Sequence, residues 1–524
     1  MQRFGETKNQ QRRQENFYFK TVYEPSHHTE VDFSWLYTPY RSTYFKKDYR
    51  NSDFTLHGGG FLISAGYHTL LPFASLDIKA AYKESENNRE APTHNINTQY
   101  EDGSWDREGF LGDLEKAQKS IQTTMGLALQ EMATGLTTHQ INLGFEAQHI
   151  RGVFDRPETS YIYTYRFNRD PSRIAYAQNE AEAKMRMYSG YLEDIVHFYR
   201  LELRPGVRFE YDSFLENRNL APRLAGALDI FGNRNTILIA GANRYYARTL
   251  LTYKLREALI PFYREVWSAE DGWQRVYSNT RATKYSSLKS PYTDEYVLGL
   301  EQALLGGRMI FKYVQREGRD QLASELSDVQ EDGLAYYTLN NNGRSHHKSY
   351  RLSWERQWRN HYLKINGTYQ ETESSNETYD DPLEEEEPPV SFEGKLTSKS
   401  ELPRKDFNRP WVINLTYVGK LPYGFTLSGL AKYRSGYKAI LKTSNRDPDI
   451  ELPDDTHPYI YEEVKRGGAV TLSCRVEWEK RLYSNHSMIL SLDIYNLLNK
   501  KTSVGNTDDY EIGRQVWAGM EYQF

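Results

Sequence analysis

The last eleven residues, Arg514–Phe524, read RQVWAGMEYQF and decide the fold. Apolar and aromatic side chains take every second position, and polar side chains fall mainly between them, which is the period of a β-strand with two different faces. The apolar row is Val516, Ala518, Met520, Tyr522 and Phe524, and the other row holds Gln515, Gly519, Glu521 and Gln523. An unpaired terminal strand invites aggregation, whereas a closed barrel has no open edge. The stretch therefore favours a barrel strand, with the last strand of a soluble β-domain as the alternative.

The composition agrees with strands that cross a membrane. The 524 residues have a mean hydropathy of -0.78, yet they include 42 Tyr, 22 Phe and 9 Trp. A membrane barrel combines these properties, because each strand needs apolar groups only at alternate positions and aromatic residues collect at the interfaces. No apolar run reaches about 18 residues, which excludes a transmembrane helix. The net charge of -5 gives no argument for nucleic-acid binding.

The single cysteine, Cys474, excludes an intrachain disulfide and any CxxC metal or redox motif. It alternates with apolar neighbours, namely Val470, Leu472, Val476 and Trp478. We therefore expect the thiol to be a small, lipid-facing apolar group.

Alternating segments recur along the chain from Asn16 onward, and the clearest are Arg200–Tyr211, Phe425–Arg434, Val470–Glu479 and Met488–Ile494. Strands of about ten residues suit a bilayer crossing, whereas the usual globular strand is nearer five or six. Tight connections are expected at residues 135–138, 232–235, 306–307, 422–424 and 484–487. Long connections are expected at residues 86–117, 152–180, 249–291, 318–343, 374–408 and 437–467. Short periplasmic turns and longer extracellular loops are typical of outer-membrane barrels.

Counting back from a periplasmic Phe524 gives about nineteen strands, the first near Asn16–Tyr23. An odd number places the N-terminus outside the cell, which a bacterial single-chain barrel with both ends in the periplasm does not allow. Met1–Glu15 carries basic residues, but neither an apolar segment nor a small-residue cleavage site follows, so it is not a secretory signal. Either the protein stays inside the cell or the chain begins downstream of its true start, and the strand count favours a truncated chain.

Several segments resemble the C-terminal barrel of TonB-dependent receptors, particularly the Oar-like kind. They are Leu203–Tyr211 (LRPGVRFEY), Ala221–Tyr246 (APRLAGALDIFGNRNTILIAGANRYY), Ser290–Asp320 with Thr293, Asp294, Glu295 and Gly299, Leu421–Tyr437 (LPYGFTLSGLAKYRSGY) and Asp493–Lys500 (DIYNLLNK). Their order and spacing extend over residues 140–524, and the first 140 residues match only by their general strand pattern. The family's N-terminal plug domain and its TonB box are absent from the sequence.

The resemblance implies an all-β fold, an antiparallel transmembrane barrel of the Gram-negative outer membrane that occupies residues 1–524 as a partial domain. About nineteen of the family's twenty-two strands are expected, with the plug and the first strands missing. The implied partners are outer-membrane lipid and lipopolysaccharide, the TonB complex through the missing plug, an unknown extracellular solute, and the barrel assembly machinery. That machinery reads the family's terminal aromatic strand, to which Tyr522 and Phe524 correspond.

No catalytic motif supports an enzyme: GxSxG, HExxH, Walker A and GxGxxG sequences are all absent. We therefore expect no catalytic, cofactor-binding or metal residues and no cofactor. The nearest approach to a cation site is acidic, namely Asp447, Asp449 and Glu451 with Asp454 and Asp455, and the run Glu384–Glu387. Ca²⁺ prefers such oxygens, but solvated loop charge is the favoured interpretation. Two histidine pairs, His27 with His28 and His346 with His347, are weak candidates, because adjacent residues on a strand point to opposite faces.

Other segments have two open interpretations each. The Tyr-rich run Tyr161–Phe167 would stack on sugars, aromatic siderophores or peptides, or would pack within a girdle or loop. Gly58, Gly59 and Gly60 would allow a bulge or a close approach by the plug. Four charged residues on the expected inner face would contact the plug or line the path, namely Lys432, Arg434, Arg475 and Glu477.

The expected function is uptake of a scarce solute through an outer-membrane receptor. A passive porin or protein-export barrel is one alternative, and an outer-membrane adhesin or assembly partner is another. The solute class, whether siderophore, cobalamin, glycan or peptide, is not readable, since fold does not fix function.

Overall fold

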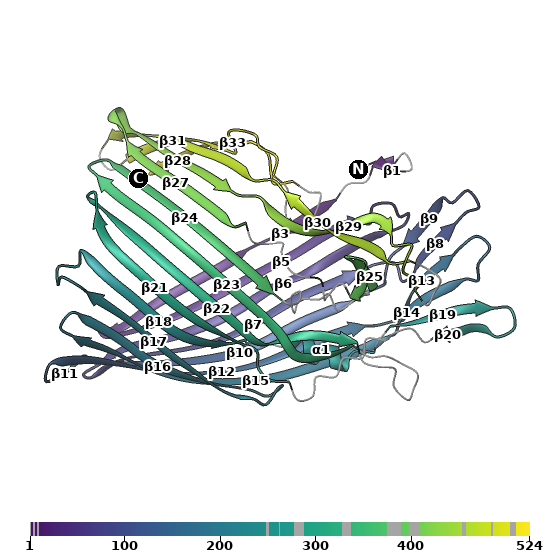
Figure 1. Cartoon of the computed structure of the whole chain (residues 1–524), viewed down its shortest axis with the longest axis horizontal. Helices are drawn as coiled ribbons and strands as arrows, with labels where there is room; N and C mark the ends of the chain where they lie inside the picture. Colours follow the sequence, from purple (N-terminus) through teal and green to yellow (C-terminus); the bar gives the residue numbers. More distant parts are fainter. Residues whose placement is uncertain are drawn as a thin grey trace.

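A large curled sheet dominates the molecule, a computed structural model drawn in Figure 1. The structure describes residues 2–3, 6–7, 10–247, 251–260, 262–276, 288–326, 337–374, 389–398, 402, 409–452, 457–483, 486–502 and 510–523. Phe524 lies outside these residues. The described chain is almost entirely β-structure, as the alternating sequence predicts.

Twenty-one strands belong to one barrel. Two are minor: β3 (Gln11–Gln14) extends the pairing of β4 along β5, and β11 (Met132–Thr134) is a three-residue strand beside β12. The other nineteen form the wall, which confirms the predicted number. They are β4 (Phe17–Ser26), β5 (Thr29–Phe45), β6 (Asp53–Leu71), β7 (Ala74–Glu90), β10 (Glu115–Leu129), β12 (Thr137–Arg156), β15 (Asn179–Phe198), β16 (Leu201–Asp212), β17 (Arg218–Asp229), β18 (Thr236–Tyr246), β21 (Tyr292–Leu304), β22 (Gly307–Leu326), β23 (Tyr337–Trp358), β24 (His361–Ser374), β27 (Trp411–Lys420), β28 (Phe425–Arg434), β31 (Ala469–Tyr483), β32 (His486–Tyr495) and β33 (Gln515–Gln523).

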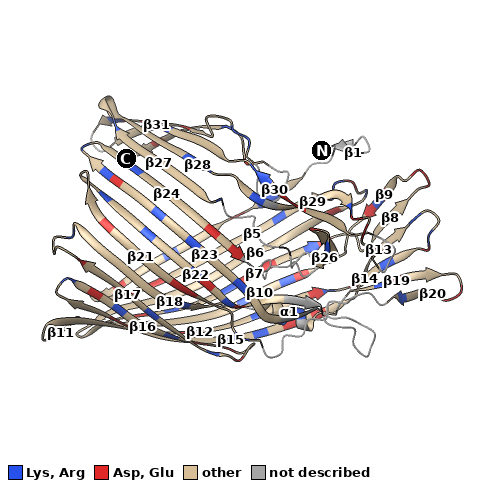
Figure 2. Ribbon diagram, viewed as in Figure 1, with Lys and Arg blue, Asp and Glu red and all other residues tan. Residues whose placement is uncertain are grey.

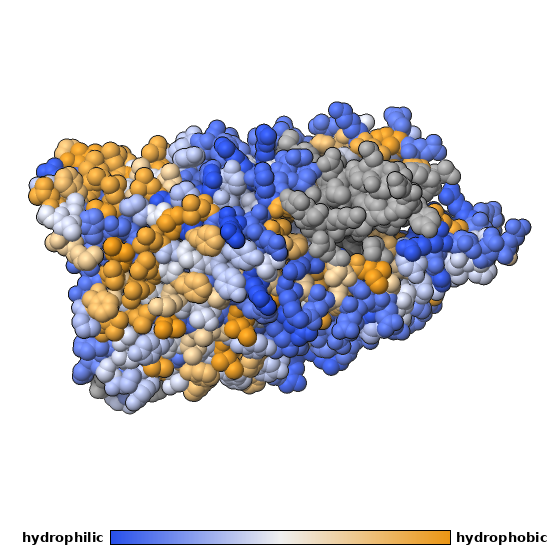
Figure 3. Space-filling view, turned by 90° about the horizontal axis from the view of Figure 1, so that it is seen from below, coloured by the Kyte–Doolittle hydropathy of each residue, from blue (hydrophilic) through white to orange (hydrophobic). Residues whose placement is uncertain are grey.

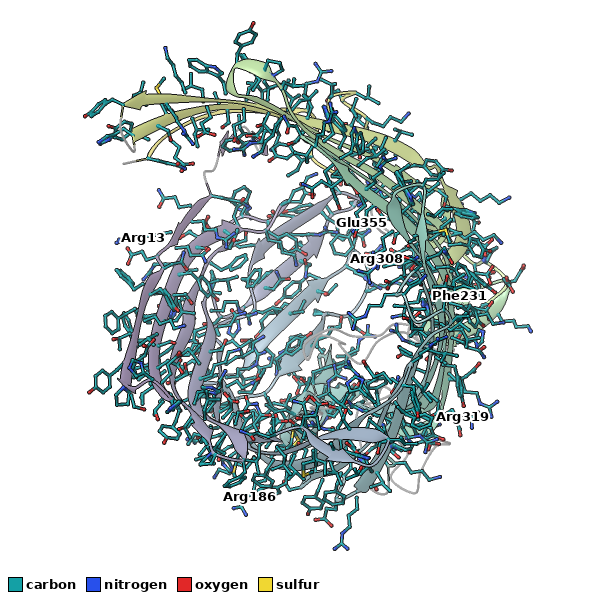
Figure 4. All side chains as sticks on the ribbon, turned by 90° about the vertical axis from the view of Figure 1, so that its left-hand side faces the viewer. Arg13, Arg186, Phe231, Arg308, Arg319 and Glu355 are labelled. Carbon is teal, nitrogen blue, oxygen red and sulfur yellow. The ribbon has the colours of Figure 1, made fainter. Side chains whose placement is uncertain are left out.

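Each wall strand pairs antiparallel with its neighbour in sequence order, from β4 and β5 through to β32 and β33. Every residue of β4 is exposed, and so are all but the first residue of β33. Within the described pairings, no register joins β33 to β3 or β4. Figure 4 looks along the barrel and shows the purple and yellow ends of the wall facing each other.

The strands separate an apolar outer face from a polar inner face. Figure 4 shows Arg308 and Glu355 reaching into the barrel, whereas Arg186 lies on the outside. Large apolar side chains are exposed on the outer face, for example Leu298 at 58% and Leu352 at 51%. Figure 3 shows apolar residues gathered toward the end with the short turns and polar residues toward the other end. This is the distribution of a barrel wall in contact with lipid.

Two rows of aromatic rings border the apolar band. One crosses β22, β23, β24 and β27 with ring centroids 4.9, 6.3 and 4.9 Å apart, and consists of Tyr313, Tyr350, Tyr369 and Trp411. The other lies nearer the short turns, with centroids 5.7 and 6.1 Å apart, and consists of Trp358, His361 and Tyr417. On β23 the rows are separated by about 27 Å of strand, which is roughly 20 Å along the bilayer normal at the usual tilt. The spacing is somewhat less than the height of about 25 Å that is usual for the apolar band between two interfacial girdles.

Several strands continue past the apolar band toward the end of the barrel with the long loops, where the polarity of the two faces reverses. β15 has 20 residues, about twice the length of a crossing. Its first part buries Asn179 and the apolar residues Ala181, Ala183 and Met185, and it exposes Glu180, Glu182, Lys184 and Arg186. From Tyr188 onward the outward positions carry Tyr188, Gly190 and Leu192. The predicted loop at residues 152–180 is therefore shorter than expected, since β12 ends at Arg156 and β15 begins at Asn179.

A short helix, α1 (Leu251–Ala258), packs on the inner face of this extension. It belongs to a cluster of buried apolar side chains, namely Leu114, Ile150, Phe154, Ala181, Ala183, Met185, Leu251 and Leu255. The Leu251 side chain lies over Gly152, where an added Cβ would be 3.2 Å from Leu251 Cδ2. Within the described part of the chain, no helix has the length and apolarity needed to cross a membrane.

Two smaller sheets lie among the long connections. The first has the order β20-β19-β14-β13-β8-β9, and Figure 1 shows it projecting beyond the wall. Its strands are β8 (Asn95–Gln99), β9 (Trp105–Gly109), β13 (Ser160–Tyr165), β14 (Ser172–Tyr176), β19 (Tyr263–Ser268) and β20 (Gly272–Val276). The second has the order β26-β25-β30-β29 and comprises β25 (Pro389–Phe392), β26 (Lys395–Ser398), β29 (Tyr437–Arg446) and β30 (Tyr459–Arg466). A two-stranded sheet pairs β1 (Gln2–Arg3) with β2 (Glu6–Thr7).

The connections at the opposite end are short, as predicted. β12 begins at Thr137, β22 follows β21 after two residues, and a 3-10 turn, η2 (Pro422–Gly424), joins β27 to β28. All the longer connections therefore lie at the other end of the barrel, which carries both small sheets (Figure 1).

Candidate functional site

The interior of the barrel is lined by polar groups that bind one another. Arg208 Nη2 donates to Glu146 Oε2 at 2.9 Å and to Ser189 Oγ at 2.6 Å, and Arg208 Nε donates to Glu210 Oε1 at 2.6 Å. Gln122 Nε2 donates to the other oxygen of Glu146 at 2.9 Å. These groups come from β10, β12, β15 and β16, which adjoin in the wall. These hydrogen bonds give each charged group of the network a partner, so this part of the wall is polar and rigid.

Beside this network the inner wall is hollowed. The hollow is lined by Asp77, Lys79, Thr124, Glu146, Tyr191 and Arg208. Tyr191 lies across Gly144, since a Cβ at this glycine would be 1.9 Å from Tyr191 Cε1. An aromatic side chain thus covers the backbone of the adjacent strand.

The Tyr-rich segment, expected either to stack on a ligand or to pack in a girdle or loop, forms β13 of the projecting sheet. Arg173 of β14 lies between two rings, with its guanidinium carbon 4.2 Å from the Tyr161 ring centroid and 4.3 Å from that of Trp273. Arg173 Nε also donates to Glu265 Oε2 at 2.5 Å. Tyr163 and Tyr165 continue the row as stacked rings with centroids 6.3 Å apart. Girdle packing is therefore not the role of this run, which builds an aromatic face around one ion pair.

This aromatic face combines residues from three separate connections. Trp267 and Trp273 pack edge to face at 5.6 Å, and His94 lies 5.4 Å from the Tyr161 ring. Burial raises the pKa of Tyr161, so its hydroxyl stays neutral. Trp267 is 41% exposed and Tyr165 is 38% exposed, so part of the ring surface is open to a ligand. Rings of this kind stack on planar or sugar-like groups.

Arg173, Glu265 and Trp273 carry no sequence signal that predicts them as members of this face. Only the Tyr-Ile-Tyr alternation of β13 signals a strand there, because one side of the segment is uniformly aromatic. The parallel pairing of β13 with β8 joins residues 67 positions apart, such as Tyr163 and Ile96. Pairing over that distance leaves no local sequence signal.

The acidic residues considered as the nearest approach to a cation site do not gather around a common point. Asp447 is buried, accepts a hydrogen bond from Ser391 Oγ at 2.5 Å and accepts another from the Asp449 backbone amide at 3.1 Å. It therefore closes a turn between β29 and β30. In the part of the chain that the structure describes, no three His, Cys, Asp or Glu side chains gather as a metal site would require. Asp454, Asp455 and Glu384–Glu387 lie outside the described residues.

The histidine pairs do not form a metal site either. His346 Nδ1 lies 2.8 Å from Glu317 Oε1 on the outer face, and His347 Nδ1 lies 2.6 Å from Thr372 Oγ1 on the inner face. This confirms that the two point to opposite sides of β23. His27 and His28 occupy the turn between β4 and β5, where the His28 backbone amide donates to Ser26 Oγ.

Most of the predicted inner-face charges bind neighbouring residues. Arg434 pairs with Glu511, and Arg475 Nη2 lies 2.8 Å from Glu477 Oε2. Lys432 lies on the same face of β28 as Arg434. Cys474 is partly buried and lies opposite Gly429 and Ile494 on the outward side of the sheet.

Gly58 and Gly59 do allow a close approach, but the approaching groups belong to neighbouring strands. A Cβ at Gly58 would lie 2.3 Å from the Glu86 carbonyl oxygen, and one at Gly59 would lie 2.3 Å from the Thr38 carbonyl oxygen. Pairing stays in register through Gly58–Gly60, so there is no bulge at these glycines.

A wide antiparallel barrel with an apolar exterior, aromatic borders, a polar interior and long loops at one end defines a class, the large outer-membrane receptor and transporter barrels. Within that class, the profile of the family described as TonB dependent receptor-like, beta-barrel matches residues 2–497. The chain belongs to this family, and the family places it in the outer membrane of a Gram-negative cell. The family consists of transporters and receptors rather than enzymes.

The chain is similar to the uncharacterized protein YddB of Escherichia coli (strain K12), with 27% identity over 439 residues that cover 79% of this chain and 53% of that protein. It thus spans about half the length of this relative. The crystal structure of the outer membrane transporter YddB from Escherichia coli superposes with a TM-score of 0.77 and 22% identity, over 98% of this chain and 69% of that one.

Two more distant structures share the fold. The siderophore receptor PirA of Acinetobacter baumannii has a TM-score of 0.65 and 11% identity over 98% of this chain and 71% of that one. A mutant of the ferric enterobactin receptor PfeA of Pseudomonas aeruginosa, in complex with enterobactin, has a TM-score of 0.62 and 13% identity over 98% and 70%. At such identities the likeness concerns the fold.

Proposed function

We propose that the chain forms the barrel wall of an outer-membrane receptor that takes up a scarce extracellular solute, driven by the TonB complex. The observation that supports this most directly is a wall of family type whose inner face is polar and extensively paired, as around Arg208 and Glu146. Such a lining lets a hydrated solute pass without binding it tightly. The solute belongs to the siderophore, cobalamin, glycan or peptide class, and siderophore receptors are among the structures with the same fold.

The projecting sheet supplies the first contact with the solute in this proposal. Its aromatic face, with Tyr165 and Trp267 exposed, lies beyond the wall on the side of the long loops (Figure 1). The same proposal includes an Oar-like subtype and a plug that couples the barrel to TonB. It also includes lipopolysaccharide around the aromatic row farther from the short turns. Recognition by the barrel assembly machinery through Tyr522 and Phe524 belongs to it as well.

Energy-dependent uptake tests the proposal. A strain that lacks the gene is complemented with the complete gene, and labelled solutes of the four classes are supplied at nanomolar concentration. Accumulation of one class that requires the gene and stops when a protonophore collapses the proton gradient supports the proposal. Accumulation that continues under the protonophore identifies a passive pore, and surface binding without accumulation identifies an adhesin. Either result contradicts coupled uptake.

A further inference from the structure

Three rungs of charge cross the inner face of β21, β22 and β23. On β22 they contain Arg308, Lys312 and Arg316, each four residues from the next, and residues at even spacing share a face of a strand. Figure 4 shows Arg308 and its partner in register, Glu355, inside the barrel. Charged positions recur along the same strands in Figure 2. All three rungs therefore face the interior.

The upper rung, at Arg316, lies nearer the long loops, and the lower rung, at Arg308, lies nearer the short turns. The charges of both rungs are neutralised. Arg316 Nε donates to Glu295 Oε2 of β21 at 2.7 Å. Arg308 pairs with Glu301 of β21 at 2.5 Å. On the other side of the lower rung, Lys364 Nζ of β24 donates to Glu355 of β23 at 2.9 Å. At both levels, carboxylates from adjacent strands compensate the cations.

The middle rung lacks this compensation. In register, Lys312 has Gly299 on β21 and Arg351 on β23, so a glycine stands at the level where the upper rung has Glu295. Both Lys312 and Arg351 are exposed, and among the described contacts neither has a carboxylate partner. Like charges directly opposite each other destabilise a sheet. The repulsion between the two cations disappears when an anion lies between them.

A neutral polar surface extends from this rung around the wall. Thr368 of β24 lies in register with Arg351, and the adjacent inner row contains Asn366, Asn414 and Lys432 on β24, β27 and β28. Three strand spacings separate β23 from β28, which corresponds to about 14 Å. Hydroxyl and amide groups thus lie between two cationic ends, at a spacing that a solute with several acidic groups can bridge.

We propose that Lys312 and Arg351, with Lys432 at the far end, form a binding site on the inner wall for a solute that carries more than one oxyanion group. The proposal rests on the proposed uptake function and specifies it: the solute that passes this wall is a polyanion of carboxylate, phosphate or sulfonate chemistry. The neutralised rungs above and below bind such a solute weakly, so the solute binds at the middle rung and not at the other two.

Binding of a fluorescent oxyanion to the purified chain tests this site. The probe is 8-hydroxypyrene-1,3,6-trisulfonate, measured by fluorescence anisotropy in a neutral detergent at low salt. The double variant Lys312→Gln/Arg351→Gln is expected to bind the probe at least about tenfold more weakly, because two unscreened attractions are lost. The control is Lys348→Gln, which removes one positive charge from the opposite face of β23, and it is expected to keep its affinity within about twofold.

A second variant tests the site without removing a cation. Gly299→Glu introduces the carboxylate that the middle rung lacks, so it is expected to weaken probe binding through an internal ion pair. Heat-modifiable migration in gels identifies variants that keep the folded barrel. Unchanged affinity in the folded double variant, or an equal loss in Lys348→Gln, overturns the site. Since this assay measures no uptake, its failure leaves the proposed transport function standing, whereas a passive result in the uptake assay contradicts the transport function alone.

Discussion

Gly58 and Gly59 hold three strands together because they lack a side chain. Both have left-handed extended backbones, with φ of 144° and 140°. We expect Gly59→Ala to destabilise the barrel by about 1–3 kcal/mol, since the new methyl group meets the Thr38 carbonyl and the backbone conformation disfavours it. The measurement is the urea midpoint of heat-modifiable migration after refolding into detergent.

Gly429→Ala is the matched control, because nothing lies within 4 Å of a Cβ at that position. It lies on β28 in an ordinary strand conformation, so its effect is expected to be near zero. Equal midpoints for Gly59→Ala and the wild type would contradict this prediction, because they would show that β5 and β6 accommodate a methyl group here without loss of stability.

Glu511 makes one contact at the barrel mouth dependent on pH. Its hydrogen bond from Arg434 holds the pKa of Glu511 below the usual range. A depressed carboxylate pKa stabilises the folded state above the unfolded value near 4.3, and this contribution is lost as the pH falls through the lower folded value. We expect the stability difference between wild type and Glu511→Gln, measured as urea midpoints from pH 6 to pH 3, to shrink toward the acid end. A difference that does not vary with pH would contradict an ionic contact.

At the scale of elements, the two faces of β27 have opposite tolerances. Leu415 is 40% exposed on the outer face between the aromatic rows, whereas Thr416 faces the interior. We expect Leu415→Arg to cost about 2–4 kcal/mol, because a cation near the bilayer midplane loses its hydration. Thr416→Arg on the same strand is the control and is expected to cost little. Refolding midpoints in lipid vesicles measure the stability cost of each variant. Equal costs would contradict the assignment of lipid to the face of β27 that carries Leu415.

The wall strands were predictable from sequence because lipid and interior impose opposite polarities on alternate residues. Arg200–Tyr211 was predicted as a strand on that basis, and β16 covers almost the same residues. The outer extension of β15 was not predictable in this way. Its charged residues Glu180, Glu182, Lys184 and Arg186 face water, and its apolar residues pack inward against α1, so the pattern no longer indicates a lipid-facing strand.

On the scale of the whole molecule, the turns and the small sheets lie at opposite ends of the wall. Gly103 lies between β8 and β9, and Tyr423 lies in the turn between β27 and β28, where its side chain is 92% exposed. We expect Gly103→Cys to react with a membrane-impermeant maleimide on intact cells, and Tyr423→Cys to react only after lysis. Both cysteines are introduced into the Cys474→Ser variant, which has no other thiol. Labelling of Tyr423→Cys on intact cells would show that the barrel has the opposite orientation in the membrane.

The candidate site was only partly predictable because its members come from distant segments. The aromatic run Tyr161–Phe167 was singled out by composition alone, and the acidic loop residue Asp447 was singled out by charge. The structure uses the first in a face shared with Trp273 and the second in a turn with Ser391. The bare middle rung at Lys312 depends on the register of three strands, which no local pattern specifies.

The projecting sheet also bears on how the sequence of this protein changes over generations. Phages, toxins and antibodies select for altered surface loops, and an isolated loop can vary freely. Here β8, β13 and β19 belong to different connections but share one hydrogen-bonded sheet. A length change within one of these strands would shift its register against strands of the other connections. We therefore expect insertions and deletions in related sequences to spare these strands and to fall at the hairpin tips.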